Sequence, residues 1–288
     1  MRRSMPMMHL AVLVVIVAVS SVAAAPRDST ALARHIDKSI DALLQAEQVP
    51  PSPRCDDAEF LRRVYLDLIG RTPTAEQAAA FLDNTQSNKR AKLIDDLLAS
   101  SDYGKHQADS WQTLLLPRTS DNRFVSFDKM TAWLEKSFND NKPWDRMVRD
   151  ILTAEGEPDK NGAVTYYLAN ASPDKLTDNA TRIFLGVQLQ CAQCHNHPFT
   201  DWKQDTYWGM AAFFTKVRIE GNPRQAARQG GKLGINESGK GRAVRLPILA
   251  KRLPPKFLQG ESPKIAASAA YRPVLADWMT SPKNAYFS

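Results

Sequence analysis

The chain has 288 residues, 43% of them hydrophobic, and a formal net charge of +7 at neutral pH. That length is enough for one large or two small domains with a proper hydrophobic core. The sequence contains no Gly-x-Ser-x-Gly elbow, phosphate-binding glycine loop or His-Glu-x-x-His pair, which excludes the commonest hydrolase and kinase signatures.

Residues 1–25 have the pattern of a secretory signal peptide. Arg2 and Arg3 precede an apolar run over 10–19, and small residues follow. The small-residue rule allows cleavage after Ala24, which we favour, or after Ala25. The alternative is an uncleaved anchor, but the apolar run is about half of the ~20 residues that a spanning helix needs. We therefore expect an exported protein, periplasmic or at the cell surface, with no stable membrane span after signal cleavage.

Removal of the signal peptide takes away two arginines, so the formal charge falls from +7 to +5. A basic exported protein is expected to meet acidic partners or surfaces. Nucleic acid is seldom encountered outside the cytoplasm, and we do not expect it as a partner.

Apolar residues recur at helical spacing along most of the chain, and strand-like alternation is scarce. Asp56 stands three residues before Glu59, and Thr74 stands three residues before Gln77, as in helix-capping boxes, while Gly70 is a helix stop. The segments that we expect to be helical are 30–48, 57–69, 74–82, 89–99, 103–116, 128–138, 143–152, 174–190 and 203–214.

The pattern predicts a mainly α fold: a multi-helix domain with a basic, Gly-rich loop or short β-hairpin region near the C-terminus. That region, 216–256, holds eleven Lys or Arg residues, two Glu residues and six glycines. Such a run is typical of a solvated surface. The alternative is that some of these cations meet acidic groups, either haem propionates or an anionic polysaccharide or protein.

The chain has three cysteines, and two of them form the pattern Cys-x-x-Cys-His at 191–195. This pattern attaches haem covalently in c-type cytochromes. Cys191 and Cys194 would each form a thioether to the porphyrin, and His195 would ligate the iron. The candidates for a sixth ligand are Met210, Met130, Met147, His106 and His35.

Aromatic residues concentrate just after this motif, where six of the sixteen residues from 199 to 214 are Phe, Trp or Tyr. Their concentration could wall a porphyrin. Aromatic residues at helical spacing also commonly form hydrophobic core, and both interpretations stay open.

Two other interpretations of the motif need no haem. Cys191, Cys194 and either His195 or His197 could hold zinc, with Asp201 or water as the fourth ligand. A disulfide between the two cysteines is plausible in an oxidising compartment and needs no cofactor. Cys55 is left over beside a Pro-rich linker, where an incidental thiol or a bond to a second chain is possible.

Two blocks of the sequence resemble a planctomycete-type exported domain of unknown function, of the PSCyt type, that commonly accompanies cytochrome c modules. They read DAEFLRRVYLDL with GRTPT at 57–74, and FLGVQLQCAQCHNHPF at 184–199 with AAFF at 211–214. The resemblance covers roughly 30–260 and implies an exported, mostly helical protein. The motif YRPVLADWM at 271–279 is similar to the start of the domain that normally follows in this family.

The resulting organisation is a signal peptide at 1–25, an N-terminal helix and Pro-rich linker at 26–55, a helical domain with the Cys-x-x-Cys-His motif at 56–260, and a truncated second domain at 261–288. We expect an exported haem c module that passes electrons to a redox partner or cytochrome module. The alternative is a non-redox scaffold or binding domain with a Cys/His metal site or a disulfide, linked to polysaccharide use.

Overall fold

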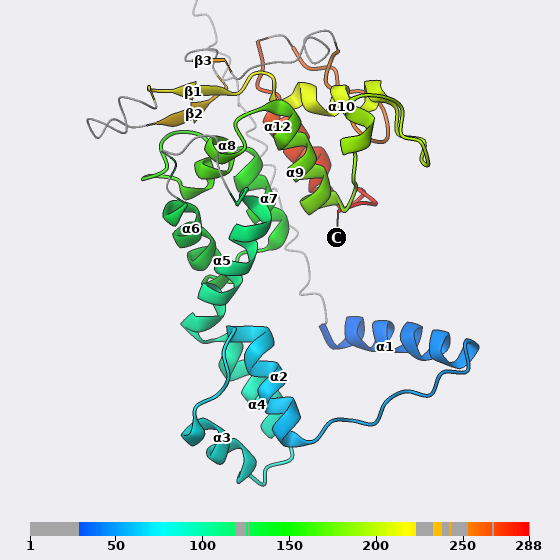
Figure 1. Cartoon of the computed structure of the whole chain (residues 1–288), viewed down its shortest axis with the longest axis vertical. Coiled ribbons are helices and arrows are strands. Elements are labelled where there is room, and N and C mark those ends of the chain that lie inside the picture. Colours follow the sequence, from blue (N-terminus) through cyan, green and yellow to red (C-terminus); the bar gives the residue numbers. More distant parts are fainter. Residues whose placement is uncertain are drawn as a thin grey trace, which may run out of the picture. The chain divides into compact units, whose positions relative to one another are not determined.

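The structure is a computed structural model that describes residues 29–118, 125, 127–222, 233–237, 242–243, 253–266 and 268–287. The predicted signal peptide and parts of the basic segment 216–256 lie outside these residues. The chain divides into two compact units, Met1–Cys55 and Asp56–Ser288. Within the described residues the fold is mainly helical, as predicted, with eleven α-helices and a few short strands (Figure 1).

The first unit contains one described helix, α1 (Ser29–Ala46). Its apolar residues Leu32, Ile36, Ile40 and Leu43 recur at helical spacing, and all four are exposed. The predicted helix 30–48 is confirmed in type and nearly in length.

The second unit begins with α2 (Asp57–Ile69), α3 (Ala75–Leu82) and α4 (Lys89–Leu98). Thr74 and Gln77 form the reciprocal capping box that was predicted, and Asp56 caps α2 by accepting from Glu59 N at 2.8 Å, which is one of the two bonds of a capping box. Gly70 ends α2 with a φ of 71°, a conformation that favours glycine. These helices enclose a small core made of Leu61, Tyr65, Ile69, Phe81 and Leu97.

A larger core lies among the following helices, which are α5 (Ser101–Leu115), α6 (Asp128–Asn139), α7 (Trp144–Leu152), α8 (Thr165–Ala169) and α9 (Pro173–Leu185). The 3-10 turn η1 (Gly162–Val164) leads into α8. Helix α5 packs along α6, and both contribute fully buried residues such as Leu115 and Leu134. Burial of these apolar side chains is the main stabilising term.

Three short antiparallel strands form a sheet in the order β2-β1-β3. They are β1 (Arg218–Glu220), β2 (Gly234–Asn236) and β3 (Arg242–Ala243). Ile219 of β1 faces Ile235 of β2, and Ile235 also bridges to Gly156. The predicted short β region near the C-terminus is therefore confirmed.

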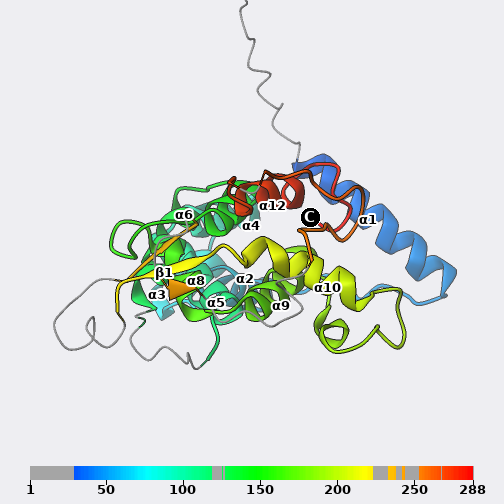
Figure 2. The ribbon, with the colours of Figure 1, turned by 90° about the horizontal axis from the view of Figure 1, so that it is seen from above.

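Two predicted helices are shorter than expected. The segment 174–190 was expected to run directly into Cys191, but α9 ends at Leu185 because Gly186 adopts a φ of 65° and caps it. The segment 203–214 divides into α10 (Gln204–Ala211) and the 3-10 turn η3 (Ala212–Phe214). The turn η3 contacts both α9 and the last helix, α12 (Arg272–Met279) (Figure 2).

Helix α12 also packs against α7, so residues 271–279 lie in the same compact unit as the motif. Among the described residues, no helix has the length and apolar character needed to cross a membrane.

Candidate functional site

The Cys-x-x-Cys-His motif lies on a short 3-10 turn, η2 (Gln190–Gln193), rather than at the end of α9. Ala192 N donates to Leu189 O at 2.8 Å and the Ala192 side chain is buried, which fixes the turn to the core. The flanking residues Cys191, Cys194 and His195 are exposed. Both thiols are free, so the two sulfurs are not joined to each other.

Helix α10 holds the backbone of this turn. The side-chain amide of Gln204 donates to Cys194 O at 2.8 Å and to Gln193 O at 3.1 Å. The indole of Trp208 donates to Gln193 O at 3.0 Å. The backbone N–H of Gln204 in turn donates to Asn196 Oδ1 at 3.0 Å. The motif therefore has a defined backbone although its reactive side chains face solvent.

The ring of His195 is oriented by its neighbour, with Nδ1 lying 2.7 Å from Asn196 O. A carbonyl oxygen can only accept, so Nδ1 must carry the proton. In the neutral ring this leaves the lone pair on Nε2. A histidine that ligates a metal commonly donates its other N–H to a carbonyl in this way.

His197 has the opposite arrangement. Its Nδ1 accepts the Phe199 backbone N–H at 3.2 Å, so in the neutral ring the proton lies on Nε2. The residue is fixed further by a bond of 2.8 Å from its own N–H to Trp202 O. As placed, neither ring nitrogen of His197 presents an unused lone pair.

The motif contains donor types that a c-type haem or a zinc ion can use. Covalent haem requires two accessible thiols and one imidazole nitrogen, which Cys191, Cys194 and His195 provide. Zinc requires four converging ligands. Across the ranges that the structure describes, no three or more His, Cys, Asp or Glu side chains converge as a metal would require.

A half-buried carboxyl group and a buried phenol, those of Asp178 and Tyr207, lie close to the motif. Tyr207 donates to Asp178 Oδ1 at 3.0 Å, across the contact between α10 and α9. Burial raises the pKa of Asp178 to about 6, with the charge of Asp174 adding to this and the Tyr207 hydrogen bond opposing it. Burial also raises the pKa of Tyr207, and the negative charges of Asp178, Asp174 and Cys194 add to the rise.

The aromatic residues after the motif are mostly core. Tyr207, Trp208, Phe213 and Phe214 are all buried in the larger hydrophobic cluster. Phe199 is the opposite case, with 92% of its surface exposed. The interpretation of the group as core is therefore correct for four of the six residues.

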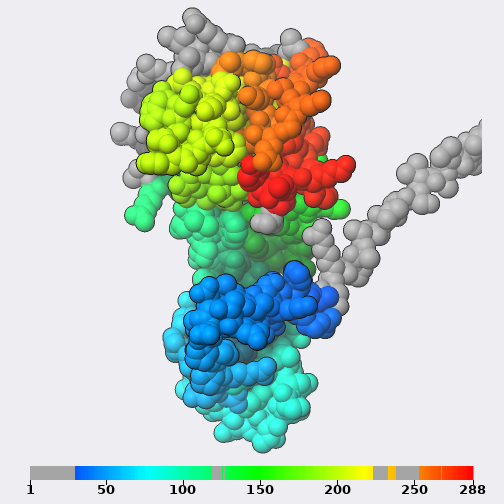
Figure 3. Space-filling model, turned by 90° about the vertical axis from the view of Figure 1, so that its right-hand side faces the viewer, coloured from blue at the N-terminus to red at the C-terminus, as the bar shows by residue number. Residues whose placement is uncertain are grey.

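The motif and the C-terminal residues share one face of the second unit (Figure 3). The ring centroids of Trp202 and Tyr286 are 6.3 Å apart, and Gln259 donates to the Tyr286 hydroxyl at 2.6 Å. The expected sixth-ligand methionines, in contrast, are core residues of α6, α7 and α10: Met130, Met147 and Met210.

Gln204 and Asp178 were not predicted as site residues. Gln204 follows Cys194 by ten residues on a different element, and Asp178 is far from Tyr207 in sequence. No periodic pattern links such positions, so only the tertiary packing reveals them.

Comparison with known families identifies a match over residues 35–219 to PSCyt2, described as a protein of unknown function (DUF1549). No curated protein matches the chain, and no solved structure matches it. The match includes both sequence blocks quoted above and spans more than half of the chain, which confirms the resemblance. The chain therefore belongs to the PSCyt2 family.

Proposed function

We propose that this chain is an exported redox module that carries one c-type haem on Cys191, Cys194 and His195. The observation that supports this most is the contact between His195 Nδ1 and Asn196 O, because it leaves the lone pair on Nε2 of the residue that directly follows two exposed, free thiols in the chain. Two thiols and an adjacent axial imidazole are what covalent haem attachment requires.

Each residue of the motif then has a separate task. Cys191 and Cys194 would hold the porphyrin through thioethers, and His195 would bind the iron through Nε2. When bound, the haem supplies one-electron transfer. The Asn196 carbonyl keeps the imidazole in the tautomer that ligation needs and increases its basicity. Gln204 keeps the turn in place from the neighbouring helix.

The proposed partner is an exported redox protein or cytochrome module. The family name itself refers to cytochromes. The signal-peptide pattern at 1–25 supports an exported chain, in the periplasm or at the cell surface, where haem c is attached. Cations of the segment 216–256 are suited to acidic groups, including haem propionates or an acidic partner surface.

A second candidate is a non-redox scaffold or polysaccharide-binding domain whose loop is closed by a disulfide. One observation favours it: both thiols are exposed and lie three positions apart on one turn. In an oxidising compartment such a pair can form a disulfide without any cofactor.

The test is the intact mass of the mature protein, exported by a host that attaches haem c. The proposal expects a gain of about 616 Da over the bare polypeptide, with a Soret band that survives acid-acetone extraction. The Cys191→Ser/Cys194→Ser variant should lose both, while Cys55→Ser should keep both. A colourless protein lighter by about 2 Da than the reduced chain would support the disulfide instead and overturn the haem proposal.

A further inference from the structure

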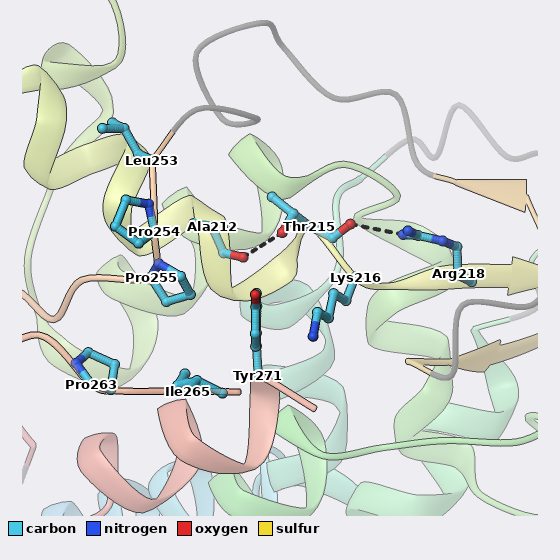
Figure 4. A pocket seen from close by; sticks show the side chains of 10 residues that line it. All are labelled: Ala212, Thr215, Lys216, Arg218, Leu253, Pro254, Pro255, Pro263, Ile265 and Tyr271. Atoms are coloured by element: carbon cyan, nitrogen blue, oxygen red, sulfur yellow. Dashed lines mark hydrogen bonds between the residues drawn. The ribbon is translucent and has the colours of Figure 1, made fainter. Parts of the chain in front are cut away.

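A cavity of about 370 Å³ lies apart from the motif, between η3, β1 and the segment that leads into α12. Figure 4 shows the Tyr271 ring between a proline-lined side and Lys216. None of the residues that line this cavity belongs to the Cys-x-x-Cys-His motif. Its volume is within the range of small-molecule sites.

One side of the cavity is cationic. Arg218 Nη1 donates to Thr215 O at 2.9 Å and to Val217 O at 3.0 Å, and no carboxylate of the described residues pairs with it. Lys216 Nζ donates to Ala269 O at 2.5 Å and lies 3.8 Å from the centroid of the Tyr271 ring. The lining contains two cations and no acidic residue. Its charge therefore favours an anion.

The other side is apolar and stiff. It is formed by Leu253, Pro254, Pro255, Pro263 and Ile265. Proline has a fixed φ and few side-chain rotamers, so such a wall loses little conformational entropy when a ligand binds. A ligand body that carried many hydroxyl groups would leave them without partners along this wall.

We propose that this cavity binds an organic monocarboxylate with an apolar body, such as a medium-chain fatty acid or an aromatic acid. The carboxylate lies towards Lys216 and Arg218, and the hydrocarbon body lies against the prolines and Ile265. Arg218 has further N–H groups besides the Nη1 that contacts the two carbonyls, and a guanidinium can bind a carboxylate through two parallel hydrogen bonds. This site is independent of haem attachment.

The test is calorimetric titration of the full mature chain with octanoate, octan-1-ol and glucuronate. Octanoate should bind saturably, and its affinity should fall as the salt concentration increases. Octan-1-ol lacks the charge and glucuronate lacks the apolar body, so neither should bind saturably. Saturable binding of glucuronate in place of octanoate would overturn the assignment of the ligand class. No saturable binding of octanoate would overturn the proposal itself.

Variants locate the site. Arg218→Gln and Lys216→Gln should each weaken octanoate binding about tenfold to a hundredfold, the usual effect of losing a charged hydrogen bond. Ile265→Ser, on the opposite wall, should weaken the binding of octanoate, because it removes apolar contact with the hydrocarbon body. Arg62→Gln removes an exposed cation from α2 and is the matched control. If octanoate bound all four variants with the same affinity, it would bind outside this cavity, and the proposal would be contradicted.

Discussion

Gln204 donates through its side-chain amide to the carbonyl oxygen of Cys194 at 2.8 Å. The same amide also donates to Gln193 O at 3.1 Å. One side chain at the start of α10 thus satisfies two carbonyls of the motif turn. The backbone of the turn is thereby preorganised, whereas its thiols and His195 remain exposed.

Substitution of Gln204 by Glu tests this preorganisation. The carboxylate cannot donate, so both bonds are lost and a negative charge faces two carbonyl oxygens. We expect the free energy of unfolding to fall by about 1–2 kcal/mol. Amide hydrogen exchange of residues 190–204 should become faster, measured by mass spectrometry on the apo chain.

The control for this measurement is Gln193→Glu. Its side chain is partly exposed, and its contribution to the turn is the backbone carbonyl, which the substitution preserves. If exchange in 190–204 accelerates equally in both variants, the Gln204 amide does not hold the turn.

The sequence predicted a helix boundary correctly where a capping residue near that boundary determines it. Asp56 and Thr74 cap α2 and α3 as expected, because capping depends on residues three positions apart. The prediction failed at Gly186, where an apolar periodicity continues to Leu189 and conceals the helix stop. Apolar periodicity indicates which residues face the core. It continues past Gly186 because α9 and the turn that follows it both pack against the larger hydrophobic core.

The chemistry of the site was predictable only in part. Cys191, Cys194 and His195 lie in one contiguous motif, so the sequence alone proposes them as candidates. The opposite orientation of His195 and His197 depends on carbonyl and amide groups brought close by the fold. The pair of Asp178 and Tyr207 depends on how α9 packs against α10. Contacts of this kind have no signature in spacing.

The two histidines should have opposite neutral tautomers. In the apo chain with Cys191→Ser/Cys194→Ser, His195 should carry its proton on Nδ1 and His197 on Nε2, because one ring donates to a carbonyl and the other accepts from an amide. Long-range nitrogen-proton correlation spectra at a pH where both rings are neutral distinguish the two forms. The same tautomer at both positions would remove the structural argument for His195 as the ligand.

Asp178 should make the free energy of unfolding fall as pH rises, whereas most carboxylates in folded proteins have the opposite effect. Burial raises its pKa from 3.8 to about 6, so between these values the unfolded chain loses this proton before the folded chain does. The contribution of Asp178 to stability is therefore present below pH 3.8 and is lost as pH rises through about 6. Denaturation curves between pH 4 and 7 should show wild type losing stability relative to Asp178→Asn as pH rises.

A second variant checks the cause of this shift. The hydrogen bond from Tyr207 lowers the pKa of Asp178, so Tyr207→Phe should move the pH-dependent loss to higher pH. If the stability of wild type and of Asp178→Asn changed in parallel with pH, the carboxyl group of Asp178 would titrate alike in the folded and unfolded chains, which would contradict the prediction.

We expect the ion pair of Arg272 and Glu237 to contribute more to the packing stability of α12 than any other single polar contact. Their side chains are only 1% and 2% exposed, and Arg272 Nε lies 3.1 Å from Glu237 Oε2. Arg272 also donates to Ala154 O at 2.7 Å, and Glu237 accepts the backbone N–H of Tyr271 at 2.7 Å. Arg272→Met would leave the Glu237 carboxylate buried without its cation. We expect a loss of about 3–5 kcal/mol in urea denaturation.

A second ion pair of α12, which is exposed, offers a matched control. Arg149 of α7 pairs with Asp277 of α12, but these side chains are 45% and 62% exposed. Arg149→Met should therefore cost less than about 1 kcal/mol, because solvent screens an exposed pair. The double variant Arg272→Met/Glu237→Gln should recover part of the loss, since the amide oxygen still accepts the Tyr271 N–H without a buried charge. Equal costs for Arg272→Met and Arg149→Met would mean that burial does not distinguish the two pairs, and α12 would then be held by its apolar contacts alone.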